Sequence, residues 1–134
     1  TWMHAARHMR ETMLDVHPDF TISEWLRLTK RLMDVGSSGR IVYDYDMRVA
    51  DPMEDADPDA PMPDMWPAYA ALPPVPKLVI RGALSDILGA GTMAEMTSRI
   101  SDCEGVTIAR TGHVPTLDED EALSAIARLL ERAQ

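Results

Sequence analysis

One aspartate and one histidine follow apolar runs at positions where a paired carboxylate and imidazole could act in acid–base catalysis. Asp86 comes shortly after the apolar run at residues 78–80, and His113 comes shortly after a second apolar run at residues 106–109. A carboxylate that accepts a hydrogen bond from one imidazole nitrogen fixes the tautomer of the ring and stabilises its protonated form. The other nitrogen is then left to act as a base. Asp86 and His113 are therefore the candidate catalytic residues, two thirds of a triad.

The elements that must position this pair are two strands and the helix between them. Residues 76–82 form a β-branched apolar run that begins at a proline and ends at a glycine, as expected for a buried strand. Residues 92–100 have helical spacing, and the second strand follows. A crossover helix makes two such strands parallel, and loops at the carboxyl ends of parallel strands build the site. We therefore expect Asp86 and His113 at one edge of the sheet, within hydrogen-bonding distance.

The remaining helices are predicted from apolar spacing and caps. A helix from Trp2 ends before Pro18, and Thr21 and Glu24 have the spacing of a capping box that begins a second helix. Residues 36–39 are expected to form a turn, and residues 41–43 a short extended segment. Residues 117–133 are predicted to form the last helix, with a buried stripe that consists of Leu123, Ile126, Leu129 and Leu130.

Composition excludes several classes of function. The chain has 134 residues and a net charge of −9, so its field repels nucleic acid. The single cysteine, Cys103, excludes a disulfide framework and a multi-cysteine metal site. His4 and His8 lie four residues apart, but no third ligand has a marked position, so we expect surface histidines and no metal or other cofactor. No run is long and apolar enough for a membrane helix, and no segment resembles a signal peptide, so a cytoplasmic location is expected.

The quoted motifs, taken together, resemble those of a known family. Residues 78–82 followed by Ser85 and Asp86, and then residues 112–115 leading into an apolar helix, resemble the last third of an α/β-hydrolase over residues 74–134. In that family the acid of the triad follows the seventh strand, and a glycine-histidine loop follows the eighth. The resemblance implies an α/β fold, the C-terminal part of an α/β-hydrolase parallel sheet with a helical cap, which is incomplete without upstream strands.

The resemblance also implies a domain organisation and a division of the catalytic groups. Residues 1–72 would be a helical cap or lid with an acidic, proline-rich connector at residues 44–64, and residues 73–134 would be the last two strands and helices of the core. The family places its nucleophile on a G-x-S-x-G turn, and this sequence contains no such motif. Since the sequence also begins at Thr1 without a methionine, we expect an upstream portion to carry the nucleophile and these residues alone to be inactive.

Three functions remain open at this point. The first is a serine-dependent hydrolase of small apolar carboxylic esters, to which this chain supplies Asp86 and His113. The second is an epoxide hydrolase or haloalkane dehalogenase with an upstream aspartate nucleophile, and the third is a non-catalytic binding module of the same fold. The expected partners are a small-molecule substrate and the upstream portion, with no nucleic acid and no membrane, and a homo-oligomer is left open as an alternative to a monomer. The predicted substrate-binding residues are Trp25, Met33, Trp66 and Val114.

Overall fold

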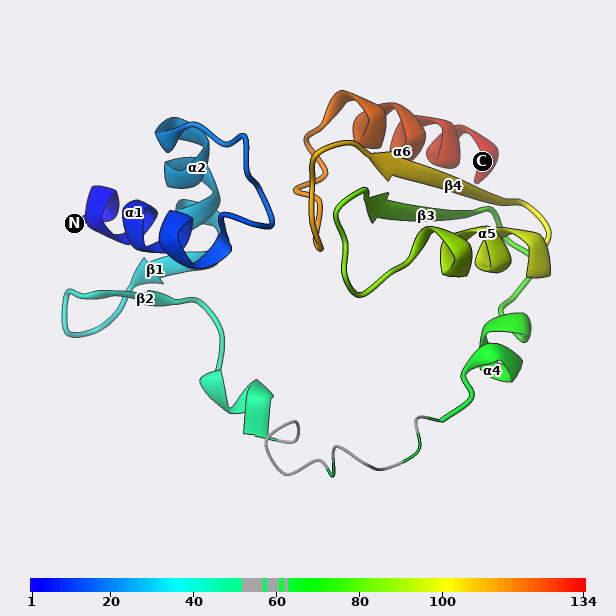
Figure 1. The fold of residues 1–134 in the computed structure, drawn as a ribbon, viewed down its shortest axis with the longest axis horizontal. Helices are drawn as coiled ribbons and strands as arrows, with labels where there is room; N and C mark the ends of the chain where they lie inside the picture. Colours follow the sequence, from blue (N-terminus) through cyan, green and yellow to red (C-terminus); the bar gives the residue numbers. More distant parts are fainter. Residues whose placement is uncertain (52–56, 58–60, 62) are drawn as a thin grey trace. The chain divides into compact units, whose positions relative to one another are not determined.

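The computed structural model describes residues 1–51, 57, 61 and 63–134 (Figure 1). The predicted acidic connector at residues 44–64 lies partly outside the described residues. The chain divides into two compact units, one consisting of Thr1–Thr12 and Phe20–Met65, the other of Met13–Asp19 and Trp66–Gln134. The short segment 13–19 thus belongs to the unit that holds the C-terminal strands, which the sequence pattern did not indicate.

The first unit contains helices and a small hairpin, which are α1 (Trp2–Met13), α2 (Ile22–Leu32), β1 (Met33–Val35), β2 (Ile41–Tyr43) and the 3-10 helix η1 (Met47–Ala50). The predicted start of α2 is confirmed, because Thr21 and Glu24 form a capping box: the Thr21 amide donates to Glu24 Oε2 at 2.6 Å, and the Glu24 amide donates to Thr21 Oγ1 at 3.4 Å. The core of the first unit contains Ala6, Met9 and Trp25, which are fully buried.

The hairpin confirms the predicted turn at residues 36–39. Strands β1 and β2 are antiparallel, with Asp34 opposite Val42. The Gly36 amide donates to the Arg40 carbonyl at 2.8 Å and closes the turn, while Gly39 has a φ of 73°, which suits glycine. Strand β1 was not predicted, because three residues directly after a helix are too few to show a strand pattern.

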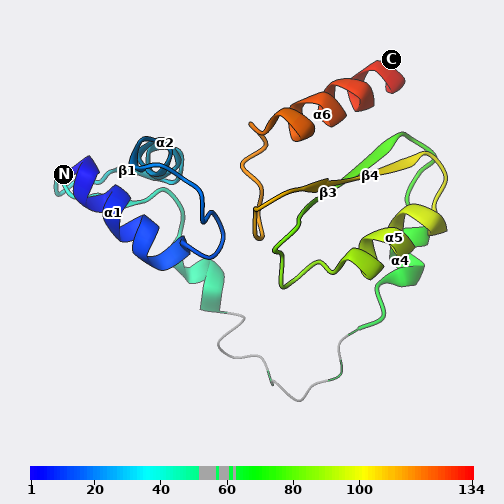
Figure 2. The same cartoon turned by 45° about the horizontal axis from the view of Figure 1, so that its top comes forward.

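The second unit is built around a parallel strand pair. Its elements are α4 (Trp66–Ala70), β3 (Lys77–Gly82), α5 (Ala90–Arg99), β4 (Cys103–Ile108) and α6 (Asp120–Arg132). Strands β3 and β4 pair in parallel along their full lengths, from Lys77 opposite Cys103 to Gly82 opposite Ile108. Helices α5 and α6 cover opposite faces of the pair (Figures 1 and 2). The predicted parallel arrangement, with a crossover helix between the strands, is therefore confirmed.

The buried face of α6 differs from the predicted leucine stripe. Ala122 and Ala125 are fully buried, whereas Leu123 and Leu130 are 51% and 58% exposed. The buried and half-buried positions are 122, 125, 126 and 129, which follow the helical spacing of i, i+3, i+4 and i+7. The prediction was wrong because it ranked residues by apolar size, while small alanines allow the helix to approach the strands closely. In the described part of the chain, no helix combines the length and the apolar character that a membrane span requires.

Candidate active site

Two loops leave the same edge of the β3–β4 pair and carry the candidate catalytic residues. Since the strands are parallel and end at the paired residues Gly82 and Ile108, the loops that follow them begin side by side. The first loop, residues 83–89, contains Asp86, and the second, residues 109–119, contains His113. The fold thus places both residues at one edge, as Figure 1 shows for the two loops.

Backbone hydrogen bonds hold the two loops together. The Ala83 amide donates to the Ile108 carbonyl at 2.8 Å, and the Leu84 amide donates to the Thr111 carbonyl at 2.9 Å. Gly82 is buried where the loops meet, and a Cβ atom at this position would lie 2.1 Å from the Gly112 carbonyl oxygen. The glycine therefore permits an approach of the two backbones that no other residue allows without movement.

Residues 13–19 hold the second loop through a backbone hydrogen bond and an ion pair. The Gly112 amide donates to the Val16 carbonyl at 2.7 Å. The Arg110 guanidinium forms a two-nitrogen ion pair with the Asp19 carboxylate, and this hydrogen bond holds the pKa of Asp19 below its usual value. Asp19 and Arg110 are 91 positions apart in the sequence, so no local pattern could have predicted their contact.

The ring of His113 contacts a residue that sequence reasoning did not select. Ser85 Oγ lies 3.3 Å from His113 Nδ1, and the same hydroxyl accepts a hydrogen bond from the Leu88 amide at 3.0 Å. Ser85 is half-buried, whereas His113 is exposed. In the sequence the only signal for Ser85 is its position immediately before Asp86.

Asp86 follows Ser85 in the same loop but takes no part in this contact. Its side chain is exposed, and no hydrogen bond or ion pair links its carboxylate to the ring of His113, although both residues are among those described. In this structure the hydroxyl of Ser85 is the group at Nδ1, the place at which we expected the Asp86 carboxylate. The catalytic roles of Asp86 and His113 stay predictions.

Comparison with known proteins identifies the fold. No protein-family model matches the chain. An α/β hydrolase from Novosphingobium aromaticivorans, known from a crystal structure, is 55% identical in sequence to this chain. The two superimpose with a TM-score of 0.86, and the match covers 98% of this chain and 46% of the hydrolase chain. The chain has the fold of part of an α/β hydrolase. A structure from Rickettsia typhi shares the fold at 21% identity, with a TM-score of 0.74 over 100% of this chain and 44% of its own.

One curated relative is also a hydrolase by name. The 3-hydroxybutyrate-oligomer hydrolase of Cupriavidus necator is 37% identical over 86 residues, which are 62% of this chain and 29% of the relative. The chain therefore spans less than half the length of each of these three relatives.

The four predicted substrate-binding residues belong to different units. Trp25 is fully buried in the first unit, edge-on to the ring of Phe20 with 5.3 Å between the ring centroids. In the second unit, the Trp66 ring lies 4.3 Å from the Arg99 guanidinium, and Val114 is 58% exposed next to His113. A shared binding pocket for these residues stays a prediction.

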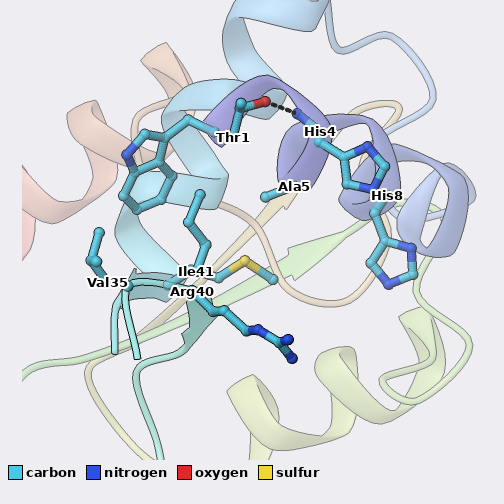
Figure 3. Close-up of a pocket in the computed structure, with 10 residues that line it drawn as sticks. Thr1, His4, Ala5, His8, Val35, Arg40 and Ile41 are labelled. Carbon is cyan, nitrogen blue, oxygen red and sulfur yellow. Dashed lines mark hydrogen bonds between the residues drawn. The ribbon is translucent and has the colours of Figure 1, made fainter. Parts of the chain in front are cut away.

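Met33, the fourth of these residues, lines a cavity of about 680 Å³ within the first unit. His4 and His8 border it from α1, and Arg40 and Ile41 border it from the hairpin (Figure 3). His4 and His8 are exposed, and among the described residues no cluster of side chains is suited to hold a metal ion. The cavity is therefore lined by apolar side chains together with one guanidinium and two imidazole groups.

His17 lies in the segment that contacts the second loop, and burial shifts its pKa. The side chain is only 3% exposed, and its burial lowers the pKa below the usual value of about 6.5, although the carboxylates of Glu119 and Asp118 act in the opposite direction. The folded protein binds the proton of His17 less readily than the unfolded chain does. The stability that comes from burying the neutral ring is therefore fully present above the pKa of the unfolded chain. It is lost as the pH falls toward the folded pKa.

We therefore expect the His17→Gln variant to lose less stability on acidification than the native protein. The measurement is urea unfolding of the complete protein at pH 7.5 and at pH 5, with the free energy of unfolding compared between the two. His8→Gln, which removes an exposed histidine of α1, is the matched control. An equal loss of stability in the native protein and in His17→Gln would show that His17 carries none of the pH dependence.

Proposed function

We propose that the complete protein is a hydrolase of small, mainly apolar carboxylic esters in which His113 is the general base. The observation that carries the proposal is the state of the His113 ring: Nδ1 is engaged by Ser85, the ring is exposed at a strand-end loop, and Nε2 has no hydrogen-bond partner in the described part of the chain. Nε2 is thus the nitrogen available to a reacting group. The α/β-hydrolase structure at 55% identity supports the reaction class.

The chemistry follows from these positions. A nucleophile outside these 134 residues, which we propose to be a serine, attacks the ester carbonyl while its proton passes to Nε2. The imidazolium then gives this proton to the departing alkoxide, and an acyl intermediate remains. In the second half of the cycle Nε2 takes a proton from water, the hydroxide attacks the acyl carbon, and the nucleophile regains its proton. In both halves His113 acts first as a base and then as an acid.

Asp86 is proposed as the acid of this triad. Its carboxylate is on the residue next to Ser85, whose hydroxyl contacts the ring that becomes positively charged during the reaction. A carboxylate close to the ring would stabilise the imidazolium. The relative from Cupriavidus necator supports an ester as substrate, since hydroxy acids form oligomers through ester bonds.

A panel of substrates tests the reaction class. We expect the complete protein to hydrolyse short-chain aryl esters such as p-nitrophenyl acetate and butyrate, with an acyl-enzyme burst that an alkyl fluorophosphonate abolishes. The same residues without the rest of the protein are expected to be inactive. Turnover of epoxides or haloalkanes instead of esters would show an aspartate nucleophile, and no turnover of any of these substrates would favour a non-catalytic binding module.

A further inference from the structure

We infer that Ser85 is a positioning residue for His113, whose hydroxyl holds Nδ1 and stabilises the imidazolium formed during the reaction. The inference rests on the proposed function and adds a residue to it. Ser85 Oγ lies 3.3 Å from Nδ1, which is a long but direct hydrogen bond, and it is half-buried between the two strand-end loops. No other hydrogen bond to the ring occurs among the described residues.

The hydrogen-bonding capacity of the hydroxyl determines what it can do. A serine hydroxyl has one hydrogen to donate and two lone pairs that accept. The Leu88 amide occupies one lone pair at 3.0 Å, so one lone pair and the hydrogen are left. In the imidazolium both ring nitrogens are donors, and Nδ1–H then donates to the remaining lone pair. Ser85 can therefore accept a hydrogen bond from the charged state of His113, and accepting it favours that state.

The loop around Ser85 is braced so that the hydroxyl keeps its place. The Ser85 amide donates to the Gly82 carbonyl at 3.0 Å. The Arg81 guanidinium bridges the loop, because its Nε donates to the Leu88 carbonyl at 2.6 Å and its Nη2 donates to the Ala83 carbonyl at 3.1 Å. A strand residue thus fixes both ends of the loop. A hydroxyl that is held before substrate binds orients the imidazole without further ordering.

Three variants of the complete protein test the inference, with p-nitrophenyl acetate as substrate. Ser85→Ala removes the hydroxyl, Ser85→Thr keeps it, and Ser101→Ala removes an exposed hydroxyl that lies away from the two loops. We expect Ser85→Ala to lower kcat by about 10- to 100-fold, the range for losing one hydrogen bond to a charged group. Ser85→Thr is expected to recover most of this loss, and Ser101→Ala to have no effect.

The pH profile separates positioning from a merely structural role. Without the acceptor at Nδ1 the imidazolium is less stable, so the rising limb of kcat/KM against pH is expected to move to lower pH in Ser85→Ala and to return in Ser85→Thr. Nitrogen-15 NMR of the ring, which does not depend on turnover, is expected to show a smaller fraction of Nδ1–H at neutral pH in Ser85→Ala. Thermal midpoints confirm that each variant is folded.

Failure of the positioning role of Ser85 and failure of the proposed function give different experimental results. An unmoved pH limb together with an unchanged Nδ1–H fraction in Ser85→Ala would overturn the positioning role and leave His113 as the base. Covalent labelling of Ser85 itself by the fluorophosphonate would also overturn it, because Ser85 would then be the nucleophile. By contrast, ordinary turnover in a variant that lacks His113 would refute the proposed function, whatever the Ser85 variants do.

Discussion

Replacement of His113 by alanine in the complete protein is expected to lower kcat on p-nitrophenyl esters by about a thousandfold or more, as removal of a triad member does in general. The physical reason is that alanine has no ring nitrogen to accept the proton of the nucleophile. Asp86→Asn is expected to lower kcat as well, because the neutral amide does not stabilise the imidazolium. Both side chains are exposed, so neither change should move the thermal midpoint far.

Ile108→Ala is the control, because it is expected to lower stability and leave turnover intact, which is the reverse of the result expected for His113→Ala. Ile108 ends β4 and is only 2% exposed, so truncation leaves a cavity that costs about 2–5 kcal/mol of stability without removing a reacting group. We expect a lower thermal midpoint and near-normal turnover per folded molecule. If His113→Ala retained ordinary turnover, the histidine would be structural and the proposed mechanism would be wrong.

Among substitutions of small residues, Gly82→Ala is expected to lower stability and turnover the most. The new Cβ would lie 2.1 Å from the Gly112 carbonyl oxygen and 2.3 Å from that of Thr111, and both are backbone atoms that cannot rotate away. The loops must therefore separate, which strains the hydrogen bond from the Leu84 amide to Thr111. Overpacking of this kind costs about 1–3 kcal/mol or more, and the displaced loops carry Ser85 and His113, so turnover should fall with stability.

Gly91→Ala is the matched control for this glycine. Gly91 lies in α5, and a Cβ there would meet nothing within 4 Å. Gly91 is the second residue of the helix, and alanine fits this position, so this variant should keep native stability and full turnover. Thermal melts and esterase assays of the two variants make the comparison. A Gly82→Ala protein with native stability and native turnover would show that the loops are not held at the distance seen here.

The sequence by itself determined the elements and their order. Local signals predicted the capping box of α2, the turn at residues 36–39 and the parallel β3–β4 pair, because each depends on residues close together in the chain. The same signals placed Asp86 and His113 on loops at one edge, since parallel strands fix where their ends lie. The family resemblance, confirmed at the level of the fold by the structure from Novosphingobium aromaticivorans, rested on these motifs.

Only the tertiary structure decided which groups meet at that edge. The contact of Ser85 with His113 depends on the turn of a loop, which strand spacing does not determine. The pair of Asp19 with Arg110 and the close approach of Gly82 to Gly112 join segments far apart in sequence, where no periodicity links the partners. The burial of Ala122 in place of Leu123 depends on the rotation of α6 against the strands. Local patterns specify elements, whereas packing between elements selects side-chain partners by shape and distance.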